Sequence, residues 1–186
     1  MKIGLTGRIA CGKSSVSKIL AEKGFDILDG DKVVHEVLTY SQVKMRIFEK
    51  FGEGVFNENG SIDRVALGAI VFADETQKTV LENIVRPSFY EAMKWGARKS
   101  GNQVIDYFKL IGTELELLVT EVWEVRVTPE IQLERLMKRN RFTEKQALER
   151  IAAQQDIFGA HFVIDNSGTL ENTRAQVESR LKILFS

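Results

Sequence analysis

The chain has 186 residues, with 26 lysines and arginines against 26 aspartates and glutamates, so its formal net charge is zero. A chain of this length buries about 70% of its unfolded surface, which is enough for one enzyme domain. The balanced charge gives no basis for general nucleic-acid binding. The single Cys11 excludes an intrachain disulfide, and no apolar run is long enough to cross a bilayer. We therefore expect a cytoplasmic protein with neither a nucleic-acid nor a membrane partner.

Residues 3–15 have the pattern of a phosphate-binding loop. An apolar strand leads to Gly7, four residues follow, and Gly12, Lys13 and Ser14 open a helix, which matches G-x-x-x-x-G-K-[S/T]. Backbone N–H groups must turn inward around a phosphate, and side chains at the two glycines would obstruct them. We expect Lys13 to reach the β- and γ-phosphates of ATP and the Ser14 hydroxyl to ligate Mg²⁺. The predicted nucleotide contacts in this stretch are Gly7, Ala10, Cys11, Gly12, Lys13, Ser14 and Ser15.

Cys11 and the two histidines are the residues to test for other chemistry. A thiol at a helix N-terminus beside Lys13 is expected to have a lowered pKa, although the simpler interpretation of Cys11 is a small residue that fits the loop. His35 and His161 have no Cys or His partners at metal-ligand spacing, so we expect no transition-metal site.

The second predicted strand covers residues 25–28 and is followed by two acidic residues, Asp29 and Asp31. In an open α/β sheet, residues just past the carboxyl end of a strand lie on the edge where ligands bind. A carboxylate there can orient an attacking hydroxyl or accept its proton. The alternative is that Asp29 or Asp31 caps a helix predicted over residues 32–38.

Residues 41–100 are mostly helical in pattern, which suggests a substrate-binding insertion over about residues 31–100. Asp63 is the expected cap of one helix. Another helix starts at Glu75, and Arg86-Pro87 is expected to end it before a last helix reaches Lys99.

Three further strands are predicted, and two of them have a candidate site residue near or just after their end. The strand over residues 103–108 places Asp106 where a carboxylate orders Mg²⁺ through water, unless Asp106 is only a cap or part of a surface turn. The alternating strand over residues 121–127 is expected to have one partly exposed face. Asn166 follows the strand over residues 162–165 and is a candidate for the adenine pocket.

A basic two-helix segment precedes the last strand. Thr128-Pro129 is expected to open the first helix, and Thr143 with Gln146 forms a predicted capping box for the second. Basic helices late in a nucleotide kinase are typical of a mobile lid, here about residues 135–158, and we expect Arg139 to reach the transferring phosphoryl group. The alternative is a merely solvated face, because glutamates stand among the basic residues.

Taken together, these motifs resemble the dephospho-coenzyme A kinase family. The resemblance implies a three-layer α/β P-loop kinase: a single domain with a parallel sheet of about five strands, a nucleotide core over about residues 1–30 and 101–186, an acceptor insertion and a lid. It also implies MgATP-dependent phosphorylation of the ribose 3′-hydroxyl of dephospho-coenzyme A. Asp31, Lys13 and Arg139 would be catalytic, and Asp31, His35 and Asp106 would bind the acceptor. The segments that carry the resemblance are residues 3–7, 12–14, 29–38, 62–72, 132–139, 150–154 and 164–168.

The chain departs from the family pattern in several places. Arg8 and Ala10 replace loop glycines, and Cys11 replaces a serine. The segment over residues 106–112 lacks the usual proline and glutamate, and the segment after Gln154 is short and lacks a basic stretch. Two alternatives therefore stay open: a P-loop kinase with another hydroxyl acceptor, and a nucleotide-binding paralogue without phosphotransfer.

Overall fold

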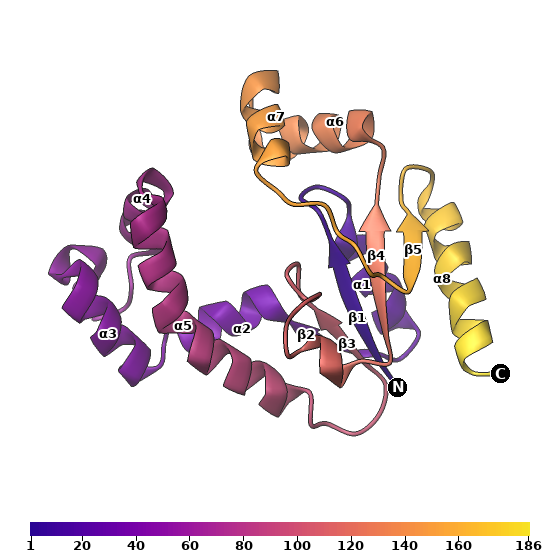
Figure 1. Ribbon diagram of the computed structural model, residues 1–186, viewed down its shortest axis with the longest axis horizontal. Helices are drawn as coiled ribbons and strands as arrows, with labels where there is room; N and C mark the ends of the chain where they lie inside the picture. The colour runs from indigo at the N-terminus through magenta and orange to yellow at the C-terminus, as the bar shows by residue number, and fades with distance from the viewer. The chain divides into compact units, whose positions relative to one another are not determined.

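The computed structural model describes residues 1–186, which divide into two compact units (Figure 1). The core unit comprises Met1–Asp29 and Lys99–Ser186, and the helical unit comprises Gly30–Arg98. In the sequence, the helical unit is inserted between the second and third strands of the core unit. None of the helices combines the length and the apolar character that a membrane crossing requires.

The core unit is built on a parallel sheet with the strand order β2-β3-β1-β4-β5. The predicted five-stranded parallel sheet is thereby confirmed. All strands end at one edge, so the loops that follow them gather there, where open α/β sheets bind ligands. The strands are β1 (Lys2–Gly7), β2 (Asp26–Asp29), β3 (Gln103–Asp106), β4 (Glu121–Arg126) and β5 (Phe162–Asp165).

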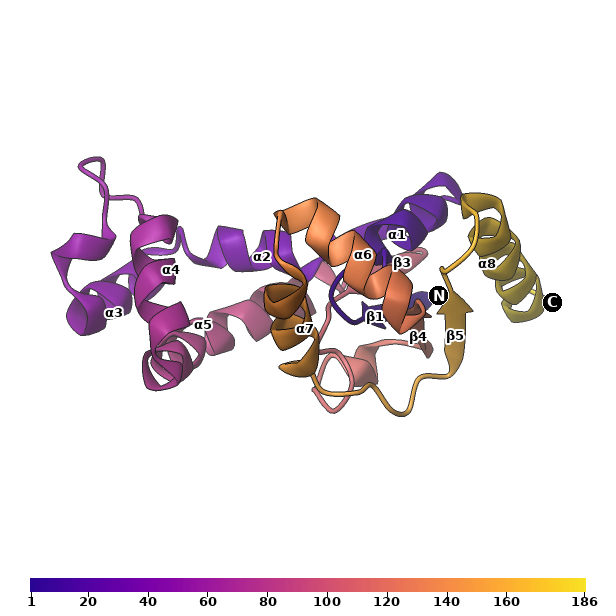
Figure 2. The same ribbon diagram turned by 90° about the horizontal axis from the view of Figure 1, so that it is seen from above.

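Helices flank this sheet and extend beyond its carboxyl edge. Figure 2 shows α1 and α8 on one face of the sheet, whereas the chain between α7 and β5 passes the other face. Apolar side chains of β1 and β4, including Leu5 and Trp123, are fully buried with Val16 and Ile19 of α1. This burial anchors the start of α1, and with it the phosphate loop, to the sheet. The helical elements are α1 (Lys13–Glu22), η2 (Glu116–Leu118), α6 (Pro129–Asn140), α7 (Glu144–Ala152) and α8 (Leu170–Leu184).

The expectation of a partly exposed face on the 121–127 strand is wrong. The strand is buried on both faces as far as Val125, and each of its charged side chains forms an ion pair. Arg126 donates to both carboxylate oxygens of Glu124, each at 2.7 Å. Glu121 accepts from Trp123 Nε1 at 2.8 Å and forms an ion pair with Arg180. Burial raises the pKa of the Glu121 carboxyl, but the hydrogen bonds from Arg180 and Trp123 outweigh it, so the pKa lies below its usual value.

In the helical unit, the helices α2, α3 and α4 pack against the long helix α5. The predicted cap at Asp63 is confirmed, because its carboxylate accepts from the N–H groups of Val65 and Ala66. The predicted break at Pro87 is wrong: the helix continues through the proline. Ile84, Phe89 and Met93 are buried on both sides of Pro87, and this packing outweighs the missing hydrogen bond. The elements are α2 (Gly30–Val37), α3 (Ser41–Phe51), η1 (Glu53–Val55), α4 (Arg64–Ala73) and α5 (Glu75–Gly96).

Candidate functional site

The loop between β1 and α1 has the backbone geometry of an anion-binding turn. Ala10 and Gly12 both have left-handed backbones, with φ values of 61° and 85°. The N–H of Cys11 donates to the carbonyl of Arg8 at 3.2 Å and closes the turn, and α1 begins at Lys13. A left-handed turn thus leads directly into the positive end of a helix dipole, an arrangement that suits a phosphate group.

Lys13 and Asp106 are brought together at this loop. Asp106 is the last residue of β3, and the side chain of Lys13 forms an ion pair with one of its carboxylate oxygens. The second oxygen accepts a hydrogen bond from Ser17 Oγ at 2.5 Å. Asp106 is buried, so the alternative of a surface turn is wrong. The pair holds the Lys13 ammonium group at the carboxyl end of β3.

Asp29 stands beside Asp106 in the register of the neighbouring strands β2 and β3, at their common carboxyl end. No group of three His, Cys, Asp or Glu side chains is arranged to hold a metal ion. The Ser14 hydroxyl at the start of α1 and carboxylate oxygens at the sheet edge are ligand types that Mg²⁺ accepts. These residues fit an ion held mainly by nucleotide phosphates, with one or two contacts from the protein.

Asn166 supports the phosphate loop through a side-chain hydrogen bond. Its Nδ2 group donates to the carbonyl of Cys11 at 2.8 Å, and its Oδ1 accepts from Thr173 Oγ1 at 2.8 Å. The side chain is buried, so both hydrogen bonds are sheltered from water. The amide is therefore engaged in supporting the loop, a role that sequence analysis did not suggest.

Sequence analysis also missed three residues that contact the loop. Gln132 Nε2 donates to the carbonyl of Ile9 at 2.8 Å, and the N–H of Ile9 donates to Gln154 Oε1 at 2.7 Å. Arg135 donates to the carbonyl of Asn166 at 3.0 Å and to that of Cys11 at 3.5 Å. The position of Gln132 and Arg135 on one face of α6, three residues apart, was the available signal.

Arg139 lies in the last turn of α6 and is exposed. Its Nε donates to Asn140 Oδ1 at 3.0 Å. The capping box of Thr143 and Gln146 at the start of α7 is confirmed. The structure therefore places Arg139 at the free end of a capped two-helix segment.

The expectation of a lowered Cys11 pKa is wrong. The thiol is buried, and this burial raises its pKa more than the Lys13 backbone N–H and ammonium charge lower it. The thiolate is the reactive form of cysteine, so burial makes this side chain less reactive at neutral pH. The interpretation as a small residue that fits the loop agrees with the structure.

Asp31 and His35 belong to the helical unit. Asp31 lies within the first turn of α2, which begins at Gly30, so it is not the residue preceding the helix. His35 follows one turn later, and residues four apart share a helix face. Both side chains are exposed.

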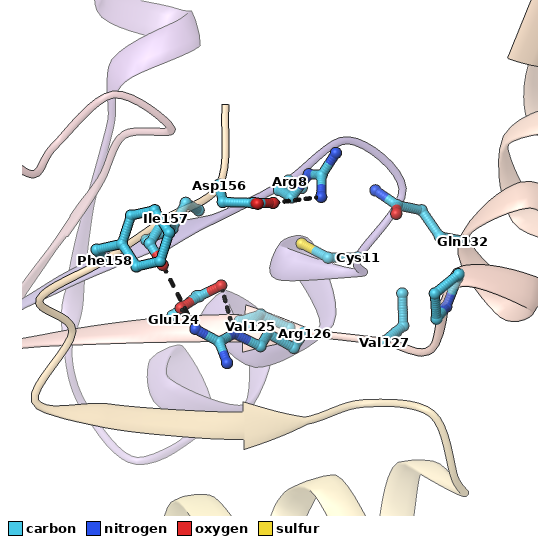
Figure 3. A pocket seen from close by; sticks show the side chains of 11 residues that line it. Arg8, Cys11, Glu124, Val125, Arg126, Val127, Gln132, Asp156, Ile157 and Phe158 are labelled. Carbon is cyan, nitrogen blue, oxygen red and sulfur yellow. Dashed lines mark hydrogen bonds and ion pairs between the residues drawn. The ribbon is translucent and has the colours of Figure 1, made fainter. Parts of the chain in front are cut away.

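A cavity of about 290 Å³ lies beside the phosphate loop at the end of β4. Figure 3 shows the Cys11 thiol within it, the Arg8–Asp156 pair on one side and Gln132 on another. Phe158 and the Glu124–Arg126 pair contribute to its walls. Its charged side chains are paired with one another: Arg8 with Asp156, and Arg126 with Glu124.

The parallel sheet, the left-handed turn and the lysine at the start of α1 define a P-loop nucleotide-binding protein. Among solved structures, the Thermus thermophilus protein TT1252 has a TM-score of 0.80 and 27% identity over 99% of this chain and 97% of that chain. The dephospho-CoA kinase of Campylobacter jejuni has a TM-score of 0.67 and 25% identity over 98% of this chain and 96% of its own.

Sequence comparison identifies the family. The dephospho-CoA kinase family profile matches residues 1–172. The dephospho-CoA kinase of Carboxydothermus hydrogenoformans is 40% identical over 185 residues, which cover 94% of this chain and 90% of that protein. The chain belongs to the dephospho-CoA kinase family. Family and full-length similarity assign it ATP-dependent phosphoryl transfer to dephospho-CoA, the first of the three interpretations that the sequence left open.

Proposed function

We propose that the phosphate loop binds the triphosphate of MgATP and that Asp31 directs the ribose 3′-hydroxyl of dephospho-CoA at the γ-phosphorus. The observation that carries the proposal is the Lys13–Asp106 pair beside a left-handed turn at the start of α1. A cation and the positive end of a helix dipole converge where phosphate charge must be stabilised.

In the reaction, the 3′-oxygen forms a bond to the γ-phosphorus while the bond from that phosphorus to the β–γ bridging oxygen breaks. The hydroxyl proton passes to the Asp31 carboxylate, and ADP leaves with the electron pair of the broken bond. Lys13 stabilises charge on the β- and γ-phosphates, and Arg139 stabilises the transferring group. His35, on the helix face of Asp31, contacts the acceptor.

Mg²⁺ supplies charge neutralisation across the β- and γ-phosphates when it is bound. Ser14 would hold the ion and Asp106 would act on it through water, while the Asp106 carboxylate also pairs with Lys13. Asn166 serves the nucleotide by fixing the Cys11 carbonyl and thereby the shape of the loop. Gly7, Ala10, Gly12 and Ser15 supply the backbone that surrounds the phosphates.

The Asp31→Asn variant tests the role of the carboxylate. It should lower kcat by at least about 100-fold, as expected for loss of a general base, while the Kd for ATP changes by less than about twofold. Glu36→Gln, on the exposed surface of the same helix, is the matched control and should keep the native kcat. A native kcat in Asp31→Asn removes Asp31 from the mechanism.

A further inference from the structure

The two-helix arm, defined as residues 129–156, contacts Ile9 of the phosphate loop near both of its ends. Gln132, near the start of α6, binds the carbonyl of Ile9, and Gln154, just after α7, binds its N–H. Both ends of the arm are thus fastened to the same residue of the loop. A displacement of the arm would have to break these bonds or carry the loop with it.

Arg8 forms an ion pair at the C-terminal end of the arm. Its NH1 group pairs with Asp156 at 2.9 Å, and its NH2 group donates to the carbonyl of Ile151 at 2.7 Å. Ile151 lies in the last turn of α7, where a cation is favourable, and its carbonyl also accepts from the N–H of Gln154 at 3.2 Å. One guanidinium group thus binds both the C-terminal end of α7 and the segment that follows this helix.

The Arg8 guanidinium is largely withdrawn from water. Its side chain is 27% exposed, and its Nε is buried without a hydrogen-bond partner. Asp156, by contrast, is 69% exposed, so it can be changed without opening the core.

We propose that Arg8 is a positioning residue for phosphoryl transfer: it holds the exit of α7 against the phosphate loop, so that the arm carrying Arg139 returns to one place relative to the loop. The proposal rests on the proposed function in assigning Arg139 to the transferring phosphoryl group. Arg8 acts through Asp156 and the Ile151 carbonyl and has no chemical role of its own.

The test combines amide hydrogen exchange with steady-state kinetics on the full chain. Arg8→Gln and Asp156→Asn should each raise exchange rates in residues 151–158 by about fivefold or more, and lower kcat/KM for ATP by about three- to tenfold. The double variant should be no worse than Arg8→Gln alone, because both changes break one interaction. Glu22→Gln, which breaks the 2.7 Å surface pair with Arg174, is the matched control and should change neither readout.

Unchanged exchange over residues 151–158 in both single variants would overturn the proposal. Additive kinetic losses in the double variant, or equal losses in Glu22→Gln, would do so as well. Amide hydrogen exchange does not depend on turnover. If the native enzyme formed no coenzyme A, the proposed function would be refuted, and the exchange rates over residues 151–158 would still test whether Arg8 holds the end of α7.

Discussion

Gly12→Ala should damage the phosphate loop by two separable routes. Gly12 has a φ of 85°, a left-handed backbone that costs an alanine about 1–2 kcal/mol. A Cβ added there would also stand 2.2 Å from Asn166 Nδ2. The amide must then move away and give up its hydrogen bond to the Cys11 carbonyl, which leaves this acceptor with only the longer 3.5 Å bond from Arg135.

The second route costs about 1–3 kcal/mol, so the variant should lose about 2–5 kcal/mol of unfolding free energy in total. Gly24→Ala is the matched control, because Gly24 has a φ of 86° and nothing within 4 Å of its added Cβ. It should lose only the backbone cost. The difference between the two variants, about 1–3 kcal/mol, measures the collision with Asn166.

Urea unfolding followed by circular dichroism measures these free energies, and Asn166→Ala completes the design. In the Asn166→Ala background the collision is absent, so Gly12→Ala should cost about 1–2 kcal/mol there. Equal losses in Gly12→Ala and Gly24→Ala, or full additivity of Gly12→Ala with Asn166→Ala, would refute the reasoning.

Three further predictions concern other parts of the chain. Cys11 should react with iodoacetamide at pH 8 more slowly than free cysteine, because burial raises its pKa; labelling as fast as free cysteine would contradict this. The pKa of Glu121 is lower when folded than when unfolded, so its stabilising contribution is present above about pH 4.3 and is lost as the pH falls through the folded value. Glu121→Gln should therefore flatten the acid limb of a stability-against-pH curve, and an acid limb as steep as that of the native protein would show that another group causes it. Pro87→Ala should raise the free energy of unfolding by about 1–3 kcal/mol by restoring a helix N–H, and a lower melting temperature would show that the proline suits its helix.

Local sequence patterns were sufficient for much of the fold. The phosphate loop, the caps at Asp63 and Thr128 and the capping box at Thr143 each lie within a few residues, where spacing and side-chain chemistry determine the structure. The parallel sheet followed from apolar strands that alternate with helices. The helix does not end at Pro87 because the burial of residues on both sides of the proline outweighs its local helix-breaking effect.

The candidate site was predictable only in part, because its supporting contacts join distant residues. Asn166 is 155 positions from Cys11, Gln154 is 145 positions from Ile9, and Lys13 is 93 positions from Asp106. No periodicity or spacing in one sequence identifies such pairs. The error on the Cys11 pKa has the same origin, since its burial depends on the packing of the loop against the sheet.

The measurement that tests the central claim most directly is product analysis of the purified protein with MgATP and dephospho-CoA. The account predicts equal amounts of ADP and coenzyme A, with the new phosphate on the ribose 3′-oxygen by phosphorus and proton NMR. Lys13→Ala should abolish both products, because the loop loses its cation. Coenzyme A formation at the native rate by Lys13→Ala, or ADP release without any coenzyme A from the native protein, would contradict the account.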